Sequence, residues 1–265
     1  MREIAVAVRE GNKNITLLET IEAIKKAGFS TVFIQWYNRQ PESCSTEEQL
    51  KLIHQLGLNV LFAHLAYKGV NVIWEEGEAG DNMVESYKND IDACKENNIP
   101  MVVMHLTTKT IAPPYGEIGL NRIKEIVKYV KEKDMKIAFE NTKIKGYVDY
   151  VLSNIKDSHV GLCFDSGHCH VHFDDDFNFE MFKDRILAVH LHDNDKTDDL
   201  HLLPFDGTID WMWVVKNLKD CNYQGPVTLE LCYRYHYLEM DPVDFYKKGY
   251  ETGVKLSKMM EGEND

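Results

Sequence analysis

Six acidic or imidazole side chains hold equivalent places along the chain, because each one comes at or near the end of a short apolar run. They are His64, His105, Glu140, Asp165, His190 and Glu230. Imidazole and carboxylate groups are ligands of zinc, manganese and iron, and carboxylates also act as general bases. Ordinary packing explains any one such residue, but several carboxylates buried together need a cation to offset the cost of their burial. We therefore predict a divalent-metal site built from these residues.

The segment from Val160 to His168 brings two candidate ligands close together in sequence. Asp165 ends an apolar run, and His168 follows three residues later, so that one metal ion can bind both side chains. In the alternative interpretation, Asp165 caps the turn that follows and His168 is its hydrogen-bonding partner. The sequence leaves both interpretations open.

The run that contains His190 also contains His192. Alternate residues of a strand face the same side, so both imidazoles can point inward at different depths. We assign His190 to the metal. We assign His192 to a supporting or substrate contact, because Asp193 or Asn194 is placed to fix its tautomer.

The loop after these histidines offers further polar groups. Asp199 and His201 can chelate a metal together. Asp210 and Trp211 are instead expected to start a helix and to anchor it.

The segments that must position these residues alternate regularly. Apolar, β-branched runs predict eight strands at Ile4–Val8, Thr31–Trp36, Asn59–Leu65, Met101–Leu106, Lys136–Glu140, Val160–Asp165, Ile186–His192 and Pro226–Leu231. Helical periodicity predicts helices at Thr16–Ala27, Thr46–Leu56, Asn82–Asn97, Glu117–Glu132, Tyr147–Asn154, Phe177–Phe182, Ile209–Leu218 and Pro242–Met259. Thr46 is the expected N-cap of the second helix.

This alternation predicts an α/β protein with a single (β/α)8 TIM barrel over residues 1–265. A strand followed by a crossover helix implies parallel pairing, and no glycine-rich dinucleotide fingerprint follows the first strand. The carboxyl ends of barrel strands meet at one mouth, so the six residues should converge there. The aromatic stretch from Tyr233 to Tyr237 fits either the rim of the barrel or the interface of a homodimer.

The charge of the chain argues against a nucleic-acid partner. Its formal net charge is −13, which repels polyanions at long range. No basic stripe opposes this field, because the lysines between Lys124 and Lys136 alternate with Glu125 and Glu132, as on a solvated helix face.

Targeting signals and cysteine usage point to the cytoplasm. The apolar run Ile4–Val8 is too short for the core of a signal peptide, and no uncharged stretch approaches the ~20 residues that cross a bilayer. The cysteines show no CxxC pair and are expected to be reduced, partly buried thiols. They are Cys44, Cys94, Cys163, Cys169, Cys221 and Cys232. We expect a cytoplasmic protein that spans no membrane.

The segments FENT, FDSGH, VHLHD, LHLLPFDGTIDW and LEL together resemble the xylose-isomerase-like barrels over essentially the whole chain. That superfamily includes sugar phosphate isomerases and epimerases and the endonuclease IV type of apurinic nuclease. The resemblance implies one catalytic divalent metal, manganese or zinc before cobalt, magnesium or iron, and no organic cofactor. Its implied ligands are Glu140, Asp165, His190 and Glu230. Further ligands, which would allow up to three zinc ions, are His64, His105, His168, Asp199 and His201.

By this resemblance the protein is expected to isomerise or epimerise a sugar, a sugar phosphate or a polyol-derived ketose. Glu140 and Glu230 would be the acid/base pair that moves a proton through a metal-stabilised enediolate. The implied substrate contacts are His64, His105, His168, His192 and Lys196. Some epimerases of this kind have an arginine six residues after the seventh-strand ligand, where this chain has Lys196.

Two alternatives come from other functional classes. An endonuclease IV-like phosphodiesterase would use a di- or trinuclear zinc cluster, against which stand the negative charge and the Asp174–Asp176 tract. The chain also has Lys143-Ile-Lys145 in place of the glycine-rich stretch that usually follows the ENT segment in the nucleases. The other alternative is a non-catalytic sugar-binding or metal-storing barrel.

Overall fold

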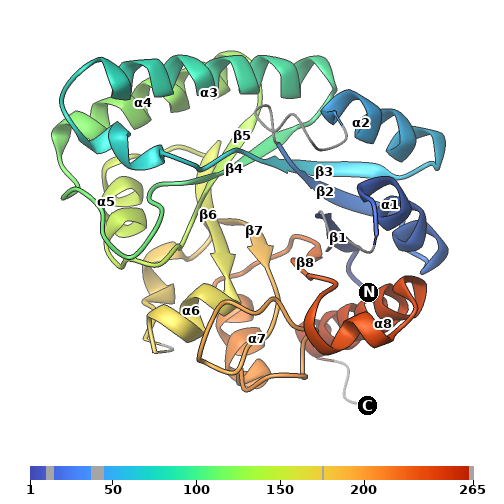
Figure 1. Ribbon diagram of the computed structural model, residues 1–265. Coiled ribbons are helices and arrows are strands. Elements are labelled where there is room, and N and C mark those ends of the chain that lie inside the picture. The colour runs from blue at the N-terminus through green and yellow to red at the C-terminus, as the bar shows by residue number, and fades with distance from the viewer. Residues whose placement is uncertain (10–14, 37–44, 175, 263–265) are drawn as a thin grey trace.

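The strands form a parallel barrel in the computed structural model, which describes residues 1–9, 15–36, 45–174 and 176–262 (Figure 1). Within these residues the strands are β1 Ile4–Val8, β2 Thr31–Gln35, β3 Asn59–His64, β4 Met101–His105, β5 Lys136–Glu140, β6 Val160–Asp165, β7 Ile186–His190 and β8 Val227–Leu229. Their order is β7-β6-β5-β4-β3-β2-β1-β8. Leu191 pairs with Leu229 just beyond β7 and joins the two ends of the sheet. The predicted TIM barrel is confirmed.

Helices follow the strands and cover the outside of the barrel (Figure 1). They are α1 Leu17–Lys26, α2 Thr46–Gln55, α3 Glu78–Glu96, α4 Glu117–Glu132, α5 Tyr147–Asn154, α6 Ser166–His172, α7 Trp211–Asp220 and α8 Pro242–Glu261. The described part of the chain also contains the short 3-10 helices η1 Val70–Trp74, η2 Phe179–Phe182 and η3 Tyr235–Glu239. None of the described helices is long and apolar enough to span a membrane.

The structure corrects two local predictions. The helix predicted at Phe177–Phe182 is wrong: α6 begins directly after β6, and only the 3-10 helix η2 lies at Phe179–Phe182. The aromatic residues there pack on one another and on Phe164, so their spacing reflects this cluster and not the face of an α-helix. The N-cap of α2 is Ser45 and not Thr46, because Ser45 and Glu48 form a reciprocal capping box.

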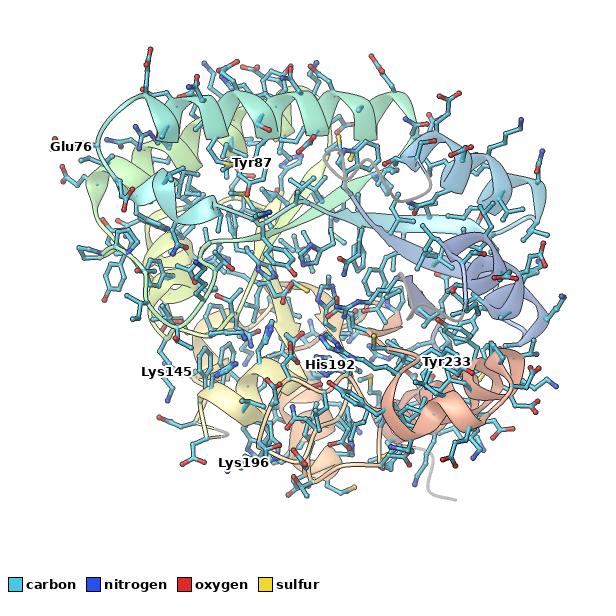
Figure 2. The ribbon with its side chains drawn as sticks, viewed as in Figure 1. Glu76, Tyr87, Lys145, His192, Lys196 and Tyr233 are labelled. Atoms are coloured by element: carbon cyan, nitrogen blue, oxygen red, sulfur yellow. The ribbon has the colours of Figure 1, made fainter. Side chains whose placement is uncertain are left out.

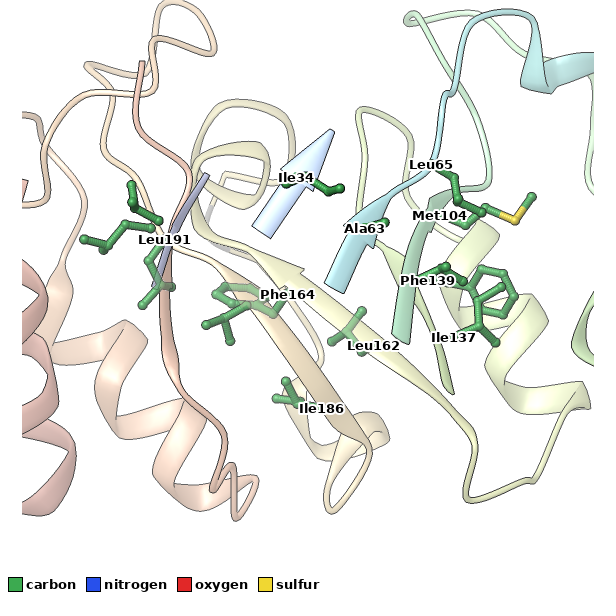
Figure 3. Close-up of a cluster of buried hydrophobic side chains, with 14 of the residues drawn as sticks. Ile34, Ala63, Leu65, Met104, Ile137, Phe139, Leu162, Phe164, Ile186 and Leu191 are labelled. Carbon is green, nitrogen blue, oxygen red and sulfur yellow. The ribbon is translucent and has the colours of Figure 1, made fainter. Parts of the chain in front are cut away.

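Strand alternation explains how the barrel aims its polar residues. Apolar residues that include Phe33, Phe62 and Ala138 fill the interior of the barrel. The residues between them, such as Ile34 and Phe139, pack outward in the apolar layer under the helices (Figure 3). The strand-end histidines and carboxylates lie two positions after these interior residues, on the same inward face of each strand. The barrel therefore places them together at one mouth.

Two further predictions concern cysteines and the rim. The described cysteines are buried thiols, and Cys44 lies outside the described residues. Tyr233 and Tyr237 are buried and donate hydrogen bonds to Met240 and Asp206 within the chain, whereas Tyr235 is exposed. Two of the three tyrosines therefore pack within the chain, and a homodimer stays a prediction.

Candidate metal and catalytic site

Glu140, at the end of β5, lies at the centre of a buried cluster of imidazoles. Its Oε1 is 3.1 Å from Nδ1 of His168 and 3.3 Å from Nε2 of His105. Its Oε2 is 3.1 Å from Nε2 of His64 and 3.1 Å from Nδ1 of His190. These imidazoles come from β3, β4, α6 and β7, so residues far apart in sequence meet around one carboxylate that is only 1% exposed.

Two more carboxylates approach the same imidazole of His190. Its Nδ1 lies 3.5 Å from Oε2 of Glu230 and 3.9 Å from Oδ2 of Asp165. Ligand atoms of Asp165, His190 and Glu230 all lie within 4.8 Å of one another, and so do those of His64, Glu140 and His190. The structure therefore brings together the four residues that the sequence suggested as ligands of one metal.

The hydrogen bonds of the histidines test whether this cluster suits a cation. His64, His168 and His201 each donate Nδ1–H to a backbone carbonyl. This leaves each Nε2 aimed at a carboxylate oxygen: Glu140 at 3.1 Å from His64, and Asp199 at 3.4 and 3.2 Å from His168 and His201. Histidines that bind metals are oriented in this way, through a hydrogen bond from the other ring nitrogen. The donor set therefore fits a divalent metal.

The imidazole of His190 supports the same conclusion. Both of its ring nitrogens are buried and have no hydrogen-bond partner among the described residues, although carboxylates surround Nδ1. Buried polar atoms are normally hydrogen-bonded, so a nitrogen left in this state is one that an ion can satisfy. Nitrogen and oxygen donors together suit manganese or zinc.

The polar groups of the loop after β7 extend the cluster. The rings of His192 and His201 stack with centroids 4.0 Å apart. Asp199 lies between them and His168, and Nε2 of His192 is 3.2 Å from Asp165. Ligand atoms of His192, His201 and Glu230 form another group within 4.8 Å. The polar groups of this loop are thus continuous with the cluster around Glu140.

The protonation states of Glu140 and Glu230 depend on the charged groups around them. Burial by itself would raise the pKa of Glu140, but the imidazoles of His105 and His190 beside it outweigh this effect and hold the pKa well below its usual value. Burial likewise opposes ionisation of Glu230, whose pKa falls to about 2 because Arg9 and His190 lie beside it. Both carboxylates are therefore ionised in the folded chain, as a metal ligand or a general base must be.

Asp165 combines two roles that the sequence left as alternatives. Its Oδ1 accepts a hydrogen bond of 2.6 Å from the backbone N–H of His168 and so caps α6. Its Oδ2 faces Nε2 of His192 at 3.2 Å. Asn141 holds Asp165 from the other side, because its side chain bonds both the N–H and the carbonyl of that residue. The carboxylate of Asp165 therefore caps α6 and belongs to the buried cluster at the same time.

The residues around Glu230 include two that sequence reasoning missed. Nη1 of Arg9 lies 3.2 Å from Oε1 of Glu230, and Nε2 of Gln35 donates to the same oxygen at 3.1 Å. Gln35 could have been found, because it ends β2 on the same inward face as Phe33. Arg9 follows β1 directly and stands two positions after the inward-facing Ala7, so the same alternation could have found it.

Lys196 is a predicted site residue that the structure does not bring to the cluster. Its ammonium pairs with Asp174 and is about half exposed. Figure 2 shows Lys196 at the periphery of the molecule and His192 in its interior. A substrate contact by Lys196 stays a prediction, and it would require this side chain to leave Asp174.

Asp193 does not orient His192, as one interpretation had it, but organises the loop that carries Asp199 and His201. The buried carboxylate of Asp193 accepts hydrogen bonds from the backbone N–H groups of Phe205 and Ile209 and from the indole N–H of Trp211. Asp210 caps α7, as predicted. The loop therefore has a fixed path.

We expect Asp193→Ala to lower the free energy of unfolding by about 2–4 kcal/mol, because it leaves several buried donors without an acceptor. Urea denaturation measures the change. Asp195→Ala is the matched control: Asp195 is exposed and accepts hydrogen bonds from the neighbouring Thr197, so stability should hardly change. Equal midpoints for the two variants would contradict the anchoring role of Asp193.

Gly167 is required by the close approach of His192. A Cβ atom at Gly167 would lie 1.9 Å from Cε1 of His192, so any side chain must displace that imidazole. We expect Gly167→Ala to destabilise the fold by about 1–3 kcal/mol and to weaken metal binding, as measured by thermal melting with and without added manganese. Gly116→Ser is the control, since nothing lies within 4 Å of a Cβ there. A Gly167→Ala variant that melts and binds metal like the control would show that His192 has room to move.

Comparisons with known proteins agree with this architecture. A family model described as xylose isomerase-like TIM barrel matches residues 21–256. Inosose isomerase from Halalkalibacterium halodurans is 22% identical over 92% of this chain and 92% of its own length. A D-tagatose 3-epimerase-like protein superposes with a TM-score of 0.77 at 19% identity, covering 99% of both chains. The IolI protein, crystallised with a bound zinc atom, gives 0.78 at 18% identity over 98% of this chain and 99% of its own.

Proposed function

The chain belongs to the xylose isomerase-like TIM barrel family, and on that premise we propose that it is a metal-dependent isomerase or epimerase of a sugar or polyol-derived ketose. The observation that carries the proposal is the approach of two buried, ionised carboxylates, Glu140 and Glu230, to one nitrogen of His190. Proton transfer to and from carbon needs such a pair of bases next to an electrophilic centre. The similarity to an inosose isomerase and to a D-tagatose 3-epimerase-like protein supports the same substrate class.

We propose that Glu140, Asp165, His190 and Glu230 hold one divalent metal. When bound, the metal supplies a Lewis acid that polarises the ketose carbonyl and acidifies the neighbouring C–H. Manganese or zinc suits the donors best, with cobalt, iron and magnesium as further options. The zinc atom in the IolI structure supports a metal of this kind.

The side chains of the site have separate roles in this reaction. One of Glu140 and Glu230 removes the proton next to the carbonyl, and the other returns a proton, either to the opposite face or to the neighbouring carbon. Arg9 and Gln35 hold Oε1 of Glu230, which leaves Oε2 directed at the centre. His64, His105 and His168 surround Glu140 and are placed to form hydrogen bonds with substrate hydroxyls.

Hydrogen exchange in deuterated water tests this function. The metal-loaded protein is incubated with ketohexoses, ketopentoses, their phosphates and inososes, and incorporation of deuterium next to the carbonyl is followed by NMR. Exchange with at least one ketose at a catalytic rate is expected. Tight sugar binding without any exchange would favour the non-catalytic barrel instead.

One observation favours the endonuclease IV-like alternative: the ligand set continues outward through Asp199 and His201 and is large enough for a second ion. The net charge of −13 opposes binding of a polyanion. Incubation with a duplex that contains one abasic site decides between the two. Strand cleavage at a catalytic rate, with no exchange into any ketose, would make the nuclease the better assignment.

A further inference from the structure

A cavity of about 860 Å³ extends from the candidate site toward α3. Gln35 and His64 line its inner end, and Met83 and Tyr87 of α3 line its outer end. Most of its surface is apolar, although polar groups stand at the rim. Pockets of ~300–1,000 Å³ bind drug-sized molecules, so this space is larger than a free monosaccharide requires.

The wall of the cavity is held in place by buried hydrogen bonds. The guanidinium of Arg122, on α4, donates to the carbonyls of Ile73 and Gly77 at 3.2 and 2.8 Å, which fixes the segment before α3. The hydroxyl of Tyr87 donates to the carbonyl of Ala66 at 3.0 Å, and Figure 2 places Tyr87 on the barrel side of α3. The cavity is therefore formed before any ligand arrives, which is the usual state of small-molecule sites.

Tyr67 forms the boundary between the cavity and the site. Its ring lines the cavity and stacks on the ring of His105, with centroids 4.4 Å apart. His105 in turn contacts Glu140. Asn71 and Thr108 bond to each other across the outer rim, at 2.8 and 3.1 Å. A molecule whose reactive carbon lies near Glu140 can thus extend past Tyr67 without leaving the protein surface.

We propose that the substrate is a keto-sugar that carries an apolar substituent, such as an alkyl or aryl glycoside, and that this substituent binds in the cavity between η1 and α3. The sugar part of the inference rests on the proposed function. The apolar part rests on the size, lining and continuity of the cavity. Burial of an aromatic ring is favourable in such a space, whereas a methyl group leaves most of the wall uncovered.

Two glycosides that differ only in the substituent test the inference. Phenyl and methyl β-D-ribo-hexopyranosid-3-ulose share the same sugar with a carbonyl at carbon 3. With the manganese-loaded protein, kcat/KM for hydrogen exchange next to the carbonyl is expected to be about 10-fold or more higher for the phenyl compound. Calorimetry should give a correspondingly lower Kd for it, whether or not exchange occurs.

Substitutions on α3 locate the effect. Met83→Trp fills the outer part of the cavity, so the phenyl-to-methyl ratio in both kcat/KM and affinity should fall toward one. Asn82→Trp adds the same indole at an exposed position of α3 that does not line the cavity and should leave the ratio unchanged. Thermal melting of both variants checks that they are folded.

The outcomes separate this inference from the proposed function. A phenyl preference in binding that Met83→Trp removes, without exchange in any ketose, supports the cavity inference and defeats the isomerase assignment. Exchange in ketoses with equal kcat/KM and equal affinity for the two glycosides overturns the cavity inference alone. Equal affinity without any exchange overturns both.

Discussion

Replacing Glu140 by glutamine should lower kcat for hydrogen exchange in the substrate ketose by about 10³-fold, within the 10²–10⁴-fold that general acid–base groups contribute. The amide keeps the shape of the side chain but accepts no proton. It also offers no negative charge to the four imidazoles that surround Glu140. Exchange rates by NMR, with metal content from elemental analysis, measure the effect.

Two comparisons make this result interpretable. Glu132→Gln changes an exposed carboxylate of α4 that pairs with Lys128 at the surface, and its turnover should equal that of the unchanged protein. Circular dichroism and the melting temperature establish that Glu140→Gln is folded. If that variant is folded, holds metal and turns over within tenfold of the original rate, Glu140 is not the acid/base group.

Removal of divalent metal is the second large effect. A chelator should abolish exchange and lower the melting temperature by about 5–10 °C, because a ligand at 100 times its Kd stabilises the folded state by about 2.7 kcal/mol. Without the ion, buried carboxylates and the orphaned nitrogens of His190 lose their compensating partner. Titration with manganese or zinc should restore both activity and stability, as followed by differential scanning fluorimetry.

A variant pair ties this effect to the cluster. His190→Ala removes the nitrogen that Glu140, Asp165 and Glu230 share, so its melting temperature should no longer respond to metal. His54→Ala removes an exposed imidazole of α2 and should respond as the original chain does. A metal response that survives in His190→Ala would place the ion elsewhere.

The order of strands and helices, and the inward direction of the strand-end residues, could be predicted from the sequence because they are local properties. The two-residue period of a strand fixes that Glu140 shares a face with Ala138 and that His190 shares one with Ala188. Closure of the barrel then brings these ends together whatever the loops do. For the same reason the four suggested ligands converge.

Contacts made between segments remote in sequence were decided only by the tertiary structure. The pairing of Arg9 and Gln35 with Glu230, the turning of Asp193 toward Trp211 and the short helix α6 depend on which loops pack against each other. The cavity beneath α3 also depends on such packing, because hydrogen bonds from Arg122 hold its wall in place. Periodicity in sequence records which side of an element is buried, whereas the path of a loop is set by partners that no local pattern encodes.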